Sequence, residues 1–315
     1  MARQVTHATG VFLGLACGDA LGRPVEGLSA DQIQATYGTL TEMVGGGVHD
    51  RSPGTVTDDT ELALCIARSL AHQGTYDPKD IVSRFVEWYR EGAFGGGRMT
   101  RKVLHRIDAG EPWEITGKRV WSESAEGTNA GNGSVMRCAP LAVTYPTNFG
   151  FLDSVSRHSS LLTHADLRCT YGCSVLNLTL AGILTGREDP LSIALSRVEE
   201  DAPRELIETL SALPDDVDPA ALEPSGYVVD TLRTALYYGL TAPDAQSAII
   251  NAVNAGGDTD TVAAIAGAVA GARHGVSSLP QRWIDTVDHS NELTQLARTL
   301  WKQVDATEAS DLFSR

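Results

Sequence analysis

Residues 254–261 read NAGGDTDT and stand directly before the small-residue run VAAIAGAVAGA at 262–272. Asp and Thr favour the first turn of a helix because their oxygens accept from free backbone N–H groups and complement the positive end of the helix dipole. The text therefore predicts a helix that begins at this point. One carboxylate is enough for such a cap, whereas Asp258 and Asp260 provide two.

The same pattern of paired acids and threonines before an apolar run occurs far upstream. Thr57-Asp58-Asp59-Thr60 stands ahead of ELALCIARSLAHQG at 61–74, and it predicts a second helix start rich in carboxylates and hydroxyls. Between the N-terminus and this cluster, Glu26 lies in a turn marked by Pro24 and Gly27. A single Glu in a turn is usually solvated, but two acidic helix starts in one chain suggest a shared site.

Composition limits the classes of partner. The 315 residues include 25 basic and 40 acidic side chains, for a formal net charge of −15, which opposes non-specific binding to nucleic acid or an anionic membrane. The N-terminus lacks a secretion signal, and no apolar run approaches the roughly 20 residues that a membrane helix needs. We expect a cytoplasmic protein, a monomer, with a single domain over residues 1–315.

The five cysteines are an odd number scattered along the chain, so a disulfide framework is not expected. Cys169 and Cys173 are four residues apart with His164 nearby, which is one possible hint of a metal. No second pair of ligands accompanies them. Because a free cysteine behaves as a small hydrophobic residue, the favoured interpretation is a buried helix.

The fold class follows from helical periodicity. Gly10, Gly14 and Gly18 are four apart in a helix predicted over 9–21, which leaves one face bare for close approach of another backbone. Apolar stripes at helical spacing recur along the chain, and the alternation typical of strands is nearly missing. The sequence therefore predicts an all-α protein. Further helices are expected near 61–72, 78–88, 100–107, 167–184, 190–199, 203–212, 227–240, 244–253 and 281–306. Asp77 is the expected cap of the helix near 78–88. A loop is expected over 38–57 and a surface segment over 187–224.

Two glycine-rich segments interrupt the helices. Residues 92–97 match neither a Walker nor a dinucleotide-binding pattern, so a mobile loop is expected there. Residues 126–140, EGTNAGNGSVMRCAP, predict a sharp bend followed by a helix carrying Arg137. Such a bend can wrap phosphate with backbone amides or simply join two helices. Ser134 is not in a nucleophile elbow, since Met136 replaces the second glycine.

Two further interpretations concern the polar groups. His164 can be a capping or packing residue or part of a site. Glu26, Asp58, Asp59, Asp258 and Asp260, with the adjoining threonines, form an all-oxygen ligand set, which suits Mg²⁺ or Mn²⁺ better than Zn²⁺. A calcium loop of the EF-hand type is excluded, since Ala263 and Val269 stand where Gly and Glu are required. Helix capping is the alternative to a two-metal site.

The motifs occur in one order. They are Gly18-Asp19-Ala20-Leu21-Gly22 followed by Glu26, Thr57-Asp58-Asp59-Thr60, Gly131-Asn132-Gly133-Ser134-Val135-Met136-Arg137, Thr163-His164 and Gly256-Gly257-Asp258-Thr259-Asp260-Thr261. The ordered set resembles the ADP-ribosylglycohydrolase family, nearest to the dinitrogenase-reductase-activating, or ADP-ribosylarginine, glycohydrolases. The resemblance covers roughly residues 8 to 290.

The resemblance implies a compact, orthogonal multi-helix domain with two Mg²⁺ or Mn²⁺ ions in a central cleft. It assigns Thr57, Asp58, Asp59 and Asp260 to one ion and Glu26, Asp258, Asp260 and Thr261 to the other. Asp59, with Asp58 and Glu26, would carry the catalysis. The implied substrate-binding residues are Asn129, Gly131, Asn132, Gly133, Ser134 and Met136. The loop from Gly131 to Arg137 would hold the diphosphate and adenosine half, with His164 near the adenine. The implied partner is an ADP-ribosylated protein or an ADP-ribose-containing small molecule.

The linkage that is cleaved stays open. The resembling enzymes have an acidic residue in the loop that here reads Ala93-Phe94-Gly95-Gly96-Gly97-Arg98, and this chain has none. Arginine-linked ADP-ribose is the first choice, with Glu91 as a possible partner for the guanidinium. The alternatives are serine-linked ADP-ribose, O-acetyl-ADP-ribose, a modified nucleobase, a non-catalytic ADP-ribose sensor, and a helical structural protein that binds no metal.

Overall fold

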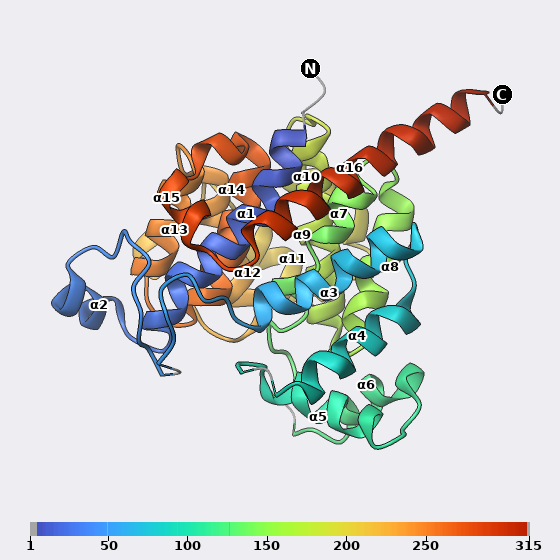
Figure 1. The fold of residues 1–315 in the computed structure, drawn as a ribbon, viewed down its shortest axis with the longest axis horizontal. Coiled ribbons are helices and arrows are strands. Elements are labelled where there is room, and N and C mark those ends of the chain that lie inside the picture. The colour runs from blue at the N-terminus through green and yellow to red at the C-terminus, as the bar shows by residue number, and fades with distance from the viewer. Residues whose placement is uncertain (1–4, 49, 93, 126, 314–315) are drawn as a thin grey trace.

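Two helices from opposite ends of the sequence, α1 (Val5–Gly22) and α14 (Thr259–His274), lie side by side in the computed structural model (Figure 1). A Cβ atom added at Gly14 would lie 2.1 Å from the carbonyl oxygen of Gly267, and one at Gly18 would lie 2.0 Å from that of Ala263. The two backbones are therefore in direct contact, as only glycine permits. The predicted bare face of the first helix is confirmed.

The structure describes residues 5–48, 50–92, 94–125 and 127–313. Within these ranges the regular secondary structure is entirely helical, so the predicted all-α class is confirmed. The other α-helices are α2 (Ala30–Tyr37), α3 (Asp58–Gln73), α4 (Pro78–Arg90), α5 (Arg98–Asp108), α6 (Trp113–Ser122), α7 (Pro140–Thr144), α8 (Phe149–Leu161), α9 (Leu167–Leu184), α10 (Pro190–Val198), α11 (Arg204–Ser211), α12 (Val228–Thr241), α13 (Ala245–Asn254), α15 (Gln281–Thr286) and α16 (Ser290–Phe313). Short 3₁₀ turns are η1 (Arg23–Val25), η2 (Val135–Arg137), η3 (Pro219–Ala221) and η4 (Val276–Ser278).

Side-chain caps explain several helix starts. The Asp77 carboxylate accepts from the backbone N–H groups of Lys79 and Asp80, at 3.0 and 3.1 Å, and begins α4 as predicted. Asp166 caps α9 in the same way. The predicted helix carrying Arg137 is wrong in length, because only the single 3₁₀ turn η2 forms before Pro140 begins α7.

Helix α9 forms much of the interior. It is the one described helix that is long and apolar enough to cross a membrane, and 89% of that window is buried inside the protein, which is typical of a core helix. All five cysteines are free and buried. Cys169 and Cys173 lie in this helix, so the buried-helix interpretation of the pair is confirmed.

One hydrophobic core joins α1, α3, α9, α12, α13 and α14, while α4, α5 and α6 lie together at one edge (Figure 1). The segment before α3 is a loop, as expected, and hydrogen bonds from one arginine side chain hold it in place. The buried Arg23 guanidinium donates to the carbonyl oxygens of Gly46, Ser52 and Thr55, at 2.8, 3.1 and 3.0 Å. These bonds bring the start of α3 toward the end of α1.

Candidate active site

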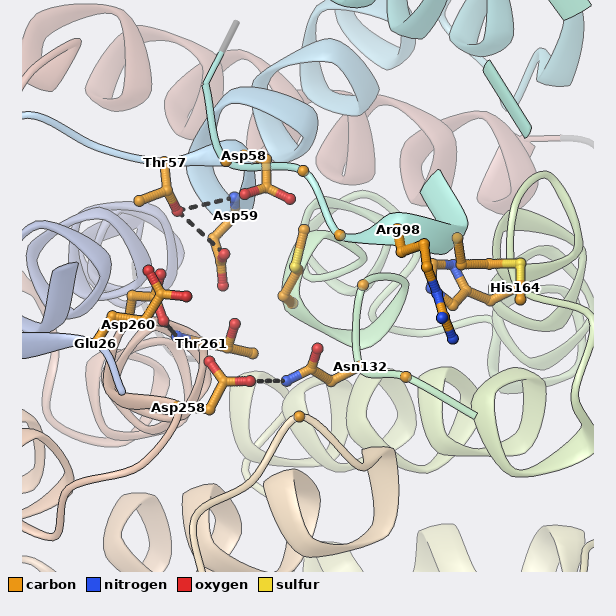
Figure 2. A pocket seen from close by; sticks show the side chains of 18 of the residues that line it. Glu26, Thr57, Asp58, Asp59, Arg98, Asn132, His164, Asp258, Asp260 and Thr261 are labelled. Atoms are coloured by element: carbon orange, nitrogen blue, oxygen red, sulfur yellow. Dashed lines mark hydrogen bonds between the residues drawn. The ribbon is translucent and has the colours of Figure 1, made fainter. Parts of the chain in front are cut away.

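A cavity of about 490 Å³ opens between the starts of α3, α5 and α14 (Figure 2). Carboxylates gather at one end, and glycine backbone, His164 and Arg98 lie toward the other. The wall is formed by Glu26, Thr57, Asp58, Asp59, Gly95, Gly96, Gly97, Arg98, Met99, Thr128, Gly131, Asn132, Gly133, Met136, His164, Gly226, Asp258, Asp260 and Thr261. All seven metal-ligand candidates therefore line one cavity.

The start of α14 supplies one group of oxygens. Asp258 occupies the N-cap position, yet its side chain makes no capping bond; its Oδ2 accepts from Asn132 Nδ2 at 2.7 Å instead. The Thr259 hydroxyl donates to the carbonyl oxygen of Gly22 at 2.8 Å, which fastens α14 to α1. Capping therefore does not account for the Asp258 carboxylate.

The start of α3 supplies the other group. Thr57 is the cap, since its Oγ1 accepts from the backbone N–H of Asp59 at 3.3 Å. Behind it, the fully buried Asp19 accepts from the N–H groups of Thr57 and Thr60 and from the Thr60 hydroxyl, at 3.0, 3.2 and 2.5 Å. Sequence reasoning missed this role of Asp19; the signal was an acid inside an otherwise apolar helix.

Glu26 reaches the same end of the cavity because the chain after α1 is tied to the turn before α14. The N–H of Gly27 donates to the Gly257 carbonyl, and the N–H of Gly257 donates to the Leu28 carbonyl, both at 2.8 Å. Gly256 and Gly257 have φ of +80° and +73°, a conformation that glycine adopts without strain. The three sequence clusters thus meet through backbone contacts.

Electrostatics at this end disfavour the ionised carboxylates. Burial raises the pKa of Asp59 well above its usual range, and the neighbouring Asp19, Asp58 and Asp258 raise it further. Burial and then Asp258 and Asp59 do the same to the pKa of Asp260. The pKa of Glu26 is raised by burial and by Asp258, and that of Asp58 by burial despite a bond from the Gly96 N–H. A bound cation would offset this repulsion.

The chemistry of these carboxylates and hydroxyls suits a divalent cation, although the side chains are not spaced for coordination in this structure. Among the described residues, no three His, Cys, Asp or Glu side chains are gathered tightly enough to hold an ion as they stand. The donor set is nevertheless all oxygen, as Mg²⁺ prefers. In addition, the buried Oδ1 of Asp59 has no hydrogen-bond partner, and a buried carboxylate oxygen without a partner is expected to find one.

The residues predicted to bind substrate divide into two groups. Gly131, Asn132, Gly133, Met136 and His164 line the cavity. Asn129 and Ser134 are buried and lie off its wall, and the Ser134 hydroxyl accepts from Ser160 Oγ at 2.9 Å.

Two other expectations need correction. Arg137 is fully buried, with its guanidinium over the Phe85 ring and one bond to Thr163 Oγ1, so it is no part of the wall. Glu91 lines a neighbouring hollow instead of this cavity.

Sequence reasoning did not place Arg98, Met99, Thr128 or Gly226 on the wall, where the structure has them. Arg98 ends the loop that lacks an acid, and Gly226 falls between the predicted surface segment 187–224 and the helix predicted over 227–240, so neither carried a signal for the site. Ala93 and Glu126, which belong to the two glycine-rich segments, lie outside the described residues.

Comparison with known proteins identifies the family to which these motifs point. The family model for ADP-ribosylglycohydrolase matches residues 2–310. An ADP-ribosyl-[dinitrogen reductase] glycohydrolase of Rhodospirillum rubrum is 34% identical over 95% of this chain and 95% of its own. An ADP-ribosylarginine hydrolase, Tri1, of Pseudomonas putida (strain GB-1) is also 34% identical, over 98% of this chain and 82% of its own.

A solved structure agrees with the sequence matches. It is described as an ADP-ribosylglycohydrolase-related protein complex, and its chain superposes with a TM-score of 0.81 at 35% identity, covering 96% of this chain and 99% of that one. The resemblance drawn from the ordered motifs is thereby confirmed. The chain belongs to the ADP-ribosylglycohydrolase family, a family of glycosidase-type hydrolases.

Proposed function

We propose that this protein is a metal-dependent hydrolase that releases ADP-ribose from modified substrates, with arginine-linked ADP-ribose on protein as the first choice. The observation that carries the proposal is the convergence of five carboxylates from three distant segments at one end of a cavity. Burial and mutual repulsion act against their ionisation, and capping does not use them all.

Two Mg²⁺ or Mn²⁺ ions would be held by this set. Thr57, Asp58, Asp59 and Asp260 would hold one, and Glu26, Asp258, Asp260 and Thr261 would hold the other, with Asp260 shared between them. When bound, such ions position the hydroxyls of a ribose and lower the pKa of a water molecule.

The side chains of the protein perform the rest of the chemistry. Asp59 accepts the proton of the attacking water, because its free Oδ1 is the buried carboxylate oxygen without another partner. Asp58 and Glu26 stabilise the positive charge that develops on the ribose as the bond from C1 to the leaving nitrogen breaks. Asn132 holds Asp258 in place. The glycines at 131 and 133 let the nucleotide half lie against the backbone.

Arginine linkage is favoured by the likeness to relatives named ADP-ribosylarginine hydrolase Tri1. A guanidinium is a cation before cleavage, and the carboxylate end of the cavity attracts it. At an exposed rim this preference is on the order of 1 kcal/mol, less than tenfold in rate. We further propose a cytoplasmic monomer; the five free cysteines are in keeping with a reducing compartment.

Metal analysis combined with incubation tests the function. Protein stripped by a chelator and reloaded with Mg²⁺ or Mn²⁺ is mixed with an arginine-ADP-ribosylated protein, and released ADP-ribose is measured. Metal-dependent release supports a hydrolase. Binding of free ADP-ribose without release indicates a sensor, and neither metal nor ADP-ribose binding indicates a structural protein.

The linkage has its own test. Initial rates on matched arginine- and serine-modified peptides are compared at several salt concentrations, and the arginine peptide is expected to react faster by less than about tenfold, with the gap narrowing as salt rises. A serine peptide turned over tenfold faster would overturn the choice of linkage while leaving the metal chemistry intact. Glu91→Gln is expected to leave the ratio unchanged, since Glu91 is off the cavity wall.

A further inference from the structure

One carboxylate lies directly behind the acidic end of the cavity without facing it. Asp19 belongs to the last turn of α1, is fully buried and does not line the cavity. Both of its oxygens accept hydrogen bonds from the start of α3. Asp19 is therefore shielded from the cavity and is not itself a candidate ligand for a cation there.

The donors that meet Asp19 belong to the residues on either side of the acidic pair of α3. The Thr57 N–H donates to Oδ1 and Oδ2 of Asp19, at 3.1 and 3.0 Å. The Thr60 N–H and hydroxyl donate to Oδ2, at 3.2 and 2.5 Å. Asp58 and Asp59 lie between these two threonines. The Asp19 carboxylate thus fixes the backbone at both ends of the segment that carries two cavity carboxylates.

The hydroxyl of Thr57 is already engaged in two bonds with Asp59 (Figure 2). It accepts from the Asp59 N–H at 3.3 Å and donates to Asp59 Oδ2 at 3.1 Å. A hydroxyl has one proton and two acceptor sites, so Thr57, which lines the cavity, keeps one acceptor site. Asp59 keeps its Oδ1, which has no partner. The relative placement of these two free acceptors depends on the backbone that Asp19 holds.

Arg23 supports the same segment from the turn that follows Asp19. Its Nε donates to the Thr55 carbonyl oxygen at 3.0 Å, two residues before the N–H of Thr57 that meets Asp19. An acid and a base one turn apart at the end of α1 therefore hold consecutive parts of the chain that leads into α3. Both are fully buried, so these contacts are sheltered from competing water.

We propose that Asp19 is a positioning residue of the metal site, which fixes the start of α3 so that Thr57 and Asp59 meet a divalent cation by side-chain movement alone. The proposal rests on the function proposed above, since the cation belongs to it. Groups that bind the ligands of an ion rather than the ion itself change metal affinity by about ten- to a hundredfold when they are removed. A negative charge behind the ligands also attracts a dication.

Calorimetric titration of the metal-free full-length protein with Mn²⁺, in the absence of substrate, tests the positioning role. Asp19→Asn keeps the shape of the side chain but removes its charge and one acceptor oxygen, and it is expected to bind Mn²⁺ about tenfold more weakly. Thr60→Val removes only the hydroxyl bond to Asp19 and should weaken binding about threefold. Thr60→Ser, which keeps the hydroxyl, should bind Mn²⁺ as the wild type does.

The matched control is Asp153→Asn. Asp153 is also a carboxylate that joins two helices, because it lies in α8 and accepts from Ser174 Oγ of α9 at 2.6 Å, and it pairs with Arg157. It does not line the cavity. The control should lower the free energy of unfolding in denaturant titration and leave Mn²⁺ affinity unchanged.

Turnover gives a second readout. In release of ADP-ribose from a modified peptide, saturating Mn²⁺ should return kcat of Asp19→Asn to within about twofold of the wild type, because Asp19 touches neither the ion nor the substrate. Circular dichroism at the assay temperature should show the wild-type helix content. A kcat that stays low at saturating Mn²⁺ would contradict the proposed role.

Wild-type Mn²⁺ affinity in Asp19→Asn would overturn the positioning role, and so would an equal loss in Asp153→Asn, which would trace weaker binding to a less stable fold. If Asp19→Asn does not fold, equal affinities of Thr60→Val and Thr60→Ser overturn the role. In each case, chelator-sensitive release of ADP-ribose by the wild type leaves the proposed function standing. If the wild type binds no Mn²⁺, the metal-dependent function fails, and the positioning role fails with it.

Discussion

The two acidic helix starts are nearly the same text but are built differently. At α3, Thr57 caps the helix, and Asp19 holds its first turn from behind. At α14 the N-cap side chain makes no capping bond, the Thr259 hydroxyl joins the helix to α1, and Asn132 holds Asp258. Asp260 Oδ1 accepts from the Thr261 N–H at 2.9 Å. At both starts, carboxylates line the cavity. The difference teaches that acidic residues at a helix start indicate a ligand site only where their oxygens are not already occupied in capping that helix.

The largest expected effect comes from removing a carboxylate at the start of α14 that lines the cavity. Asp260→Asn, at the shared position of the proposed ions, is expected to lower the rate of ADP-ribose release by on the order of 10³-fold, with Asp258→Asn close behind. Circular dichroism should show an unchanged helical fold. Full activity in either variant, or in metal-stripped wild type, would contradict the two-ion proposal.

Next comes the contact that brings the two starts together. A methyl group at Gly14 would lie 2.1 Å from the Gly267 carbonyl oxygen, so Gly14→Ala must separate α1 from α14. We expect a loss of roughly 3 kcal/mol in the free energy of unfolding, measured by denaturant titration. The control is Gly150→Ala in α8, where the nearest atom is the end of the Arg197 side chain. Equal stability of the two variants would contradict this expectation and would show that α1 and α14 tolerate a wider separation.

Asp19 distinguishes the α3 start from that of α14. Asp19→Ala removes the acceptor of three buried donors, on Thr57 and Thr60, and should cost about 2 to 3 kcal/mol in unfolding free energy. Asp244→Ala is the comparison, because Asp244 is an ordinary cap for the Ser247 N–H of α13, worth about 1 kcal/mol. If Asp19→Ala lowers the free energy of unfolding no more than Asp244→Ala does, Asp19 contributes only as much as an ordinary helix cap.

The smallest expected change in stability comes from Thr259→Val, which is compared with Thr57→Val. Thr259→Val removes the bond to the Gly22 carbonyl and is expected to cost about 1 kcal/mol in stability with activity largely kept. Thr57→Val should lose activity as well, since Thr57 lines the cavity and is a proposed ligand. Paired measurements of melting temperature and rate on the two variants decide this. The distinction fails if Thr259→Val loses the greater share of activity.

Local sequence determined much of the helical framework. The starts at Asp77 and Asp258, the buried span 167–184 and the bare face of Gly10, Gly14 and Gly18 follow from capping chemistry and periodicity, which act within a few residues. The same local signals failed at Arg137, because Pro140 interrupts the segment and leaves a single 3₁₀ turn.

The tertiary structure alone decided which polar groups share the cavity. Sequence named the carboxylates, since the four acids beside two helix starts exceed what capping uses and the ordered motifs added Glu26. It did not show that Glu91 and Arg137 lie off the wall, that Arg98 lies on it, or that Asp19 supports α3. Those outcomes depend on contacts between residues far apart in the chain, such as Gly14 with Gly267. Composition and spacing record which chemistry is present, whereas packing decides where each side chain lies and which partners it meets.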